Sequence, residues 1–416
     1  MGWRVLVVPL VVTSIAACSP YGAGAFACTD SSQCSGGTCT AGYCAFADST
    51  CSSGERYGAA SGPMSNACVG AVDMTADAPN AVDDAPMQAL DAFQFEDAPL
   101  PTMFCYGSGL AQPCFTTMPT GDTTLANDID TDTSSSCQAT IGNQPWCTIA
   151  ANTITVAATL RITGGKPLVL VGIASVTITG ELNVASTRAG GEVQGASDDF
   201  AMCNKGTPPA NSAGGAGGSF GGTGGNGGDG TNNAGHGVAG ATQTPSAMRG
   251  GCPGQAGAGG TGGAAGHGGG ALALISNTTI SIPGTINASG EGGAGGKAPS
   301  SGGGGGGAGG LIVLDAPAVT SVGQVFANGG GGAEASGVTS NDGANGNDPG
   351  VGGAAGTNGA SSGGQGGAGG FGMTAAAPGQ SVAGHAGGGG GGGVGVIKLY
   401  RATSISGGTI SPPPST

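Results

Sequence analysis

Residues 302–332 read GGGGGGAGGLIVLDAPAVTSVGQVFANGGGG, and this stretch decides how the chain is expected to fold. An all-apolar run at 311–314 is followed by a turn and then by a second segment that carries Val319, Val322, Gly323 and Val325. Apolar residues at every second position are typical of a strand with one buried face, and an unbroken apolar run is typical of a strand covered on both faces. The stretch therefore predicts two strands flanked by Gly-rich tracts.

The same layout recurs along the chain. Residues 168–171 and 272–275 are further all-apolar runs, and a looser copy begins at Val394 and contains Ile397 and Leu399. The segments that follow these runs carry Val176, Ile178, Gly180, Leu182 and Val184; then Ile280, Ile282, Gly284 and Ile286; and last Ile405, Gly407 and Ile410. Residues 154–162 form an earlier partner.

Repeated units that cannot bury their apolar strand alone are typical of stacked repeat folds. Together the repeats predict a mainly β chain whose distal domain, residues 104–416, is an irregular parallel β-solenoid or β-helix-like structure with long inserts. An antiparallel β-sandwich built from the same strands is the alternative. The composition, with 94 Gly, 8% charged and 4% aromatic residues, argues against a helical or aromatic-filled core.

The inserts between the repeats are Gly-rich tracts at about 190–270, 290–310 and 329–393. Gly loses more conformational entropy on ordering than any other residue, so these tracts are expected either to be flexible loops or to adopt a special packing. Residues 217–228 carry paired Gly at every third position, which suits extended helices of three residues per turn. Such helices would cover the outer face of the sheet. Both interpretations remain open from the sequence.

The N-terminal residues have the pattern of an export signal. Residues 5–17 are apolar behind Arg4, and this run is too short to span a bilayer as a helix. Residues 15–18, Ile-Ala-Ala-Cys, resemble the bacterial lipobox, which implies a signal peptide at 1–17, lipid on Cys18 and a lipid-anchored N-terminus at 18–27. Ser19 implies, by analogy with such lipoproteins, sorting to the outer membrane. An ordinary signal peptide that leaves Cys18 as a thiol is the alternative.

The cysteine count also favours export. Without Cys18, twelve of the 13 cysteines remain, an even number that suits complete pairing in an oxidising compartment. The candidates for disulfides are Cys28, Cys34, Cys39, Cys44, Cys51, Cys68, Cys105, Cys114, Cys137, Cys147, Cys203 and Cys252. Six of them lie in residues 28–70, a segment predicted to be a small disulfide module because it is too polar to build a core. No CxxC spacing supports the rival zinc site, and the connectivity stays open.

Residues 71–103 form an acidic Asp, Ala and Pro segment without Lys or Arg, which predicts an extended linker. The net charge of −14 argues against nucleic acid and anionic membrane surfaces as partners, because both repel an acidic chain. Membrane attachment is therefore expected through the N-terminal lipid alone.

Residues 302–314, followed by 325–332, resemble Gly-rich surface lipoproteins of Gram-negative bacteria and, more distantly, the PGRS Gly-rich surface proteins. The resemblance covers about residues 145–410. It implies a place at the cell surface, and it carries over no catalytic residues.

Candidate chemistry is sparse. Asp128, Asp130 and Asp132 alternate and would share one face of a strand, as a calcium site or an acid/base pair would need. Calcium is therefore the one cofactor considered. His236, His267 and His385 each follow Ala-Gly, so they are either stacked as a ladder or metal site or exposed loop residues.

These observations predict a cell-surface, lipid-anchored structural or adhesive protein without catalytic activity. Its expected partners are a polysaccharide, a matrix component or another cell surface. Two alternatives remain: a carbohydrate-active enzyme, a lyase or hydrolase on a β-helix, and a protein that binds ice or another surface.

Overall fold

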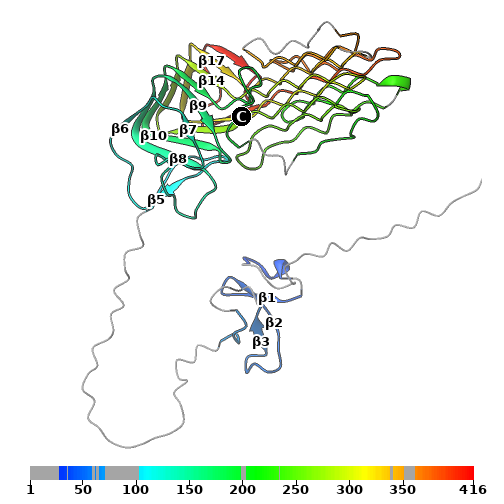
Figure 1. Ribbon diagram of the computed structural model, residues 1–416. Helices are drawn as coiled ribbons and strands as arrows, with labels where there is room; N and C mark the ends of the chain where they lie inside the picture. The colour runs from blue at the N-terminus through cyan, green and yellow to red at the C-terminus, as the bar shows by residue number, and fades with distance from the viewer. Residues whose placement is uncertain are drawn as a thin grey trace, which may run out of the picture. The chain divides into compact units, whose positions relative to one another are not determined.

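The computed structural model describes residues 28–34, 36–58, 61, 65–70, 103–197, 203–233, 235–337, 341–350 and 361–416. The chain divides into two compact units, Met1–Phe95 and Glu96–Thr416 (Figure 1). The predicted signal peptide, the lipidation site at Cys18 and residues 71–102 of the predicted linker lie outside the described residues. Within the described ranges, no helix has the length and apolar character needed to cross a membrane.

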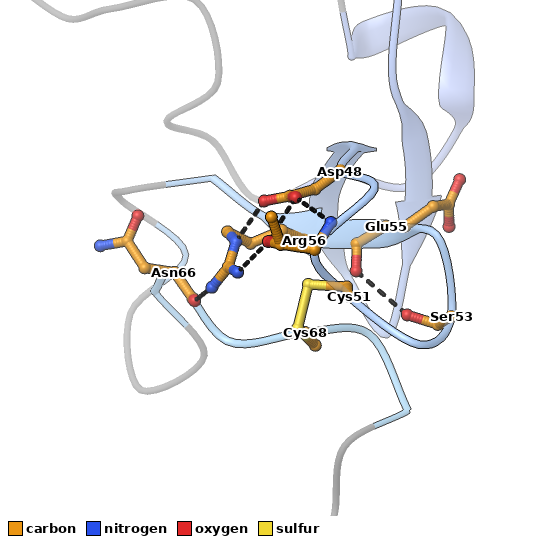
Figure 2. The surroundings of a disulfide bond; sticks show 8 residues. Asp48, Cys51, Ser53, Glu55, Arg56, Asn66 and Cys68 are labelled. Carbon is orange, nitrogen blue, oxygen red and sulfur yellow. Dashed lines mark hydrogen bonds and ion pairs between the residues drawn. A yellow bond between two sulfur atoms is a disulfide. The ribbon is translucent and has the colours of Figure 1, made fainter.

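The first unit is held together by disulfides. A 3-10 turn, η1 (Ser31–Gln33), precedes three antiparallel strands, β1 (Thr38–Thr40), β2 (Tyr43–Ala47) and β3 (Glu55–Tyr57). The bonds join Cys28 to Cys39, Cys34 to Cys44 and Cys51 to Cys68. Figure 2 shows the last of them. The small buried cluster of this unit consists of cysteines with Phe46 beside them, which confirms that cross-links take the place of an apolar core.

The second unit contains two large sheets whose strands pair in parallel. The first sheet contains β6 (Asp122–Leu125), β8 (Cys147–Val156), β10 (Leu168–Ile178), β12 (Ala271–Ser276), β13 (Thr279–Ile282), β15 (Leu311–Asp315), β16 (Ala318–Ser321) and β18 (Val396–Tyr400). The second contains β7 (Ile129–Asp130), β9 (Thr159–Thr163), β11 (Glu181–Asn183), β14 (Thr285–Asn287), β17 (Gln324–Phe326) and β19 (Thr409–Ser411). A mainly β chain with parallel sheets is thus confirmed, and the antiparallel sandwich is wrong because every pairing in these two sheets is parallel.

The strand register agrees with the repeat in the sequence. Leu170, Leu274, Leu314 and Leu399 are aligned across β10, β12, β15 and β18. In the second sheet, Leu182, Ile286, Val325 and Ile410 are aligned in the same way. Gly284 and Gly323 lie at the bend between the sheets, where a backbone carbonyl of the preceding repeat occupies the place of a β-carbon. Only Gly permits this close approach.

Both faces of the first sheet are buried. Leu168, Leu170 and Ile312 belong to a core that also contains Leu160 and Leu182 of the second sheet. The opposite face belongs to another cluster, which contains Val169, Val171, Ala271, Ala273, Ile275, Leu311 and Val313 together with Tyr106, Phe115, Phe220 and Met248. This outer face is covered by the hairpin of β4 (Phe104–Cys105) and β5 (Cys114–Phe115) and by side chains of the first Gly-rich insert.

Two details of the predicted repeat differ from the structure. Val322 is 85% exposed, because β16 ends at Ser321 and it is Ser321 that aligns with Ile282. β6 and β7 extend the sheets before β8 and β9, where the predicted apolar repeat has no copy because residues 122–130 are rich in Asp and Thr. Only the alternation of Asp128, Asp130 and Asp132 indicates a strand there.

In the residues that the structure describes, the Gly-rich tracts are ordered, which favours the packed interpretation over flexible loops. Successive residues of 302–310 donate backbone hydrogen bonds to three neighbouring segments in turn, so that every third residue donates to the same segment. Gly302, Gly305 and Ala308 donate to Ala258, Gln255 and Cys252; Gly303, Gly306 and Gly309 donate to Gly387, Gly390 and Gly393; and Gly304, Gly307 and Gly310 donate to Ala294, Glu291 and Ala288. A rotation with a period of three residues is the geometry of polyproline II helices, which have three residues per turn. We call this array, residues 204–270, 288–310 and 327–395 where described, the glycine bundle.

The segments of the glycine bundle run away from the sheets and return to them (Figure 1). Residues 288–296 leave after β14 and residues 302–310 return to β15, while residues 327–337 leave after β17 and residues 387–395 return to β18. The connecting turns at 259–261, 297–301 and 382–386 therefore lie at the end remote from the sheets. η3 (Thr231–Asn233), a single 3-10 turn, lies at the same end.

Candidate functional site

The second unit brings together a group of polar side chains from distant parts of the sequence. Glu192 follows β11, His267 lies on a segment that returns to β12, and Glu291 lies on the segment that leaves β14. One ligand atom from each residue lies within 4.8 Å of the others. Glu192 Oε1 is 2.9 Å from His267 Nε2, and the backbone N–H of His267 donates to Glu291 Oε2 at 2.9 Å.

Arg188 connects this group to the bundle. Its guanidinium lies 2.8 Å from Glu291 Oε1 and 3.5 Å from Glu192 Oε2, and it donates to the carbonyl oxygens of Gly292 and Ala265. Asp348 accepts from the backbone N–H groups of Arg188, Ala189 and Gly292. The cluster therefore links the loop after β11 to several bundle segments.

Burial differs sharply within the cluster. The side chain of Glu192 is 50% exposed, that of His267 is 14% exposed and that of Glu291 is fully buried. Burial raises the pKa of the Glu291 carboxyl, while the hydrogen bond from His267 N–H and the charge of Arg188 act in the opposite direction. Because Glu291 has no exposed surface, a polysaccharide cannot reach it as it would reach a catalytic acid.

The predicted calcium ligands are not gathered in this way. Asp128 accepts from Arg161 N–H, Asp132 accepts from Gly165 N–H, and Asp130 accepts from Asp132 N–H and the Thr133 hydroxyl. β7 ends at Asp130, so the trio does not share a strand face, and among the described residues it forms no group with ligand atoms within 4.8 Å. Hydrogen bonds lower the pKa of Asp130, the largest being that from Asp132 N–H, as expected of a carboxylate that caps a turn.

The three histidines have separate environments rather than forming a ladder. His236 Nδ1 lies 2.7 Å from Asp229 Oδ1, and Asp229 also contacts Ser381. The hydrogen bond with His236 is the main cause that lowers the pKa of Asp229. His385 lies in the turn at 382–386. Of the three histidines, His267 is the one that contacts two carboxylates. The Ala-Gly-His pattern in the sequence indicates this histidine but gives no indication of its carboxylate partners.

The remote end of the glycine bundle is a second candidate site. Asn211, Asn232, Asn233, Lys297 and Asp342 are exposed there, and Lys297 Nζ lies 3.1 Å from Asp342 Oδ2. Ser212 Oγ accepts from the backbone N–H of Thr231 at 3.0 Å, and Gly387 N–H donates to the carbonyl oxygen of Ser212 at 3.0 Å, so these turns are fixed to the bundle. We call the exposed residues at this end the polar tip.

No family model matches the chain, and neither a curated protein nor a solved structure is similar to it. The six disulfides, which pair all twelve predicted cysteines, are therefore the strongest general indication of biological setting. Bonds of this number are typical of extracellular or exported proteins.

Proposed function

We propose that this chain is a structural or adhesive protein of the cell surface, without catalytic activity, held to the outer membrane by lipid on Cys18. In this proposal the disulfide module and the acidic segment are a stalk, and the second unit is a β-solenoid that displays the glycine bundle. The parallel alignment of Leu170, Leu274, Leu314 and Leu399 supports successive solenoid layers.

The observation that carries the proposal is how side chains are distributed in the glycine bundle. Inside it, segments contact one another through backbone, and glycines such as Gly303 and Gly306 have a carbonyl oxygen where a β-carbon would lie. Backbone contacts of this kind present no side chain to a partner, and the polar side chains buried inside the bundle, such as Glu291 and Glu334, are not accessible to a macromolecular partner. Side chains that can recognise a partner are concentrated at the turns, and above all at the polar tip.

The polar tip suits a hydrated partner. Its residues offer amide, ammonium and carboxylate groups, which form hydrogen bonds with sugar hydroxyls, and the backbone beneath them is held by the bundle. A preorganised surface loses little conformational entropy on binding. A polysaccharide or a glycan-rich surface is therefore the partner class that we propose.

The test is binding of the labelled full chain to a panel of bacterial polysaccharides and to intact Gram-negative cells. The informative variant is Asn232→Gly with Asn233→Gly, because both residues have positive φ, 61° and 53°, and Gly keeps that backbone while removing the amides. The matched control is Val322→Ser, an exposed residue beside the sheets.

We expect at least tenfold weaker binding for the double Gly variant and unchanged binding for Val322→Ser. Equal binding by all three proteins would refute recognition by the tip. Release of reducing-end or unsaturated products from the same polysaccharides would instead identify an enzyme. Intact mass of the membrane-extracted protein beside Cys18→Ala tests the anchor separately, since lipid must be absent from the variant.

A further inference from the structure

We propose that Glu192, His267 and Glu291 bind a divalent transition-metal ion of the zinc class. The proposal concerns a site in the second unit remote from the polar tip, and it does not depend on the adhesive function. It rests on the donor atoms, their separation and the surplus of negative charge around them.

The donor set favours zinc over calcium. Zn²⁺ binds both imidazole nitrogen and carboxylate oxygen, whereas Ca²⁺ takes six to eight oxygen ligands and has no use for the imidazole. The ligand atoms lie within 4.8 Å of one another. Tetrahedral bonds of about 2.0–2.2 Å would set ligand atoms about 3.4 Å apart, so His267 Nε2 and Glu192 Oε1 would separate slightly from 2.9 Å and any wider pair would close. The side-chain amide of Gln194 also lies 3.2 Å from His267 Nε2 and adds a polar group at the open side.

Glu291 has spare coordinating capacity. Its Oε2 accepts from His267 N–H, but its buried Oε1 receives no hydrogen bond and is held by the ion pair with Arg188. A carboxylate oxygen has two lone pairs, so the ion pair with Arg188 leaves Oε1 able to make a further interaction. A metal ion beside it would use this remaining capacity.

The surrounding charge is consistent with a cation. Glu192 and Glu291 carry two negative charges against one positive charge on Arg188, and the carboxylate of Asp348 lies on the backbone of the same loop. Arg188 would then orient the Glu291 carboxylate through their ion pair, as groups that contact the ligands do in other metal sites.

The consequence of binding would be mechanical. The three ligands belong to the loop after β11, the segment that returns to β12 and the segment that leaves β14, so one ion would tie the sheets to the glycine bundle. A metal that binds only the folded protein stabilises it by mass action.

The experiment uses the full oxidised chain without an affinity tag, freed of metal by a chelator and then titrated with ZnCl₂ in a calorimeter. Thermal unfolding is recorded with Zn²⁺, with Ca²⁺ and with neither. The variants are Glu192→Gln, which changes a half-exposed side chain, and His267→Gln. His236→Gln is the control, because that histidine pairs with Asp229 instead.

We expect one Zn²⁺ per chain, a rise in Tm with Zn²⁺ but not with Ca²⁺, at least tenfold weaker binding for Glu192→Gln and its loss for His267→Gln. His236→Gln should bind as the wild type does. Unfolding curves recorded without metal show whether each variant is folded. Wild-type protein that binds no Zn²⁺, or Glu192→Gln and His267→Gln variants that are folded and bind as tightly as wild type, would show that the cluster is an ion-pair network only.

Discussion

The carbonyl oxygen of Gly307 lies where a β-carbon on Gly392 would be placed. These residues belong to segments that return to β15 and β18, and both bond to the backbone of Gly330. The Gly330 N–H donates to the Gly307 carbonyl oxygen, and the Gly330 carbonyl oxygen accepts from Gly392 N–H. The glycine bundle thus obtains its order from hydrogen bonds and close backbone packing, which offset the entropy that Gly loses on folding.

We therefore predict that Gly392→Ala destabilises the second unit by about 1–3 kcal/mol, the range for overpacking a filled interior. The matched control is Gly260→Ala, because Gly260 is exposed in a turn with nothing near its β-carbon position. That variant should stay within about 0.5 kcal/mol of wild type. Urea unfolding followed by circular dichroism measures both, and equal stability of the two variants would show that the bundle tolerates side chains inside it.

The period of the apolar residues predicts the repeated strands from β8 onward and most of their register, because the apolar run and the Gly at the bend recur. It misplaces Val322, since Ser321 pairs with Ile282. The order of the Gly tracts could not be decided from sequence. A Gly-Gly-x pattern is compatible with a flexible loop and with a packed helix, and the difference depends on neighbouring segments from distant parts of the chain. Residues 302–310, for example, contact segments near 255, 291 and 390.

Phe220 links the glycine bundle to the first sheet. It is fully buried in the cluster that contains Val169 and Val171, and the guanidinium of Arg249 lies 5.2 Å from its ring centroid. We predict that Phe220→Ala lowers the free energy of unfolding by about 3–5 kcal/mol. Phe220→Leu, which keeps most of the side-chain volume, should lower it by about 1.5 kcal/mol or less.

Fluorescence of Trp146, which packs against the same cluster, reports this unfolding. If the urea midpoint of Phe220→Ala equals that of the wild type, the stability of the glycine bundle does not depend on the contact between Phe220 and the first sheet.

The disulfide between Cys203 and Cys252 closes a loop with a sequence separation of 49 within the first insert. A chain-entropy estimate for such a loop gives a stabilisation of about 4 kcal/mol. Replacing both cysteines with Ser should therefore lower the free energy of unfolding by up to that amount. The disulfide between Cys105 and Cys114 closes a separation of only 9, so replacing both of these cysteines with Ser should cost about 1.5 kcal/mol less. Chemical unfolding under oxidising conditions compares the two pairs, and a larger loss for the short loop would contradict the entropic account.

The candidate metal site was less accessible to sequence reasoning than the fold. His267 was flagged by its Ala-Gly-His context, but Glu192 and Glu291 are 75 and 24 positions away from it, and no spacing rule connects them. Alternation placed Asp128, Asp130 and Asp132 on one predicted strand face. A turn begins after Asp130 instead, because its carboxylate accepts hydrogen bonds from the residues that follow.

Asp48 gives the disulfide module a defined response to acid. Its carboxylate accepts from the hydroxyl and the N–H of Thr50 and from Arg56 Nε, and these bonds hold its pKa far below the usual value of 3.8 (Figure 2). The folded module thus binds a proton at Asp48 less readily than the unfolded chain does. The contribution of Asp48 to stability is complete above pH 4, falls as the pH is lowered towards the folded pKa, and is absent below it.

We predict that Asp48→Asn lowers the Tm of the module at pH 6 and reduces the further fall in Tm between pH 4 and pH 2. The amide NMR signals of β2 and β3 follow the module within the full chain, and the carboxyl carbon shift of Asp48 gives its titration midpoint. The control is Glu55→Gln. Glu55 lies beside Arg56 in β3, but its side chain takes no part in the ion pair between Arg56 and Asp48. A midpoint near 3.8, or the same dependence of Tm on pH for Asp48→Asn and wild type, would show that Arg56 and Thr50 do not stabilise the charged carboxylate.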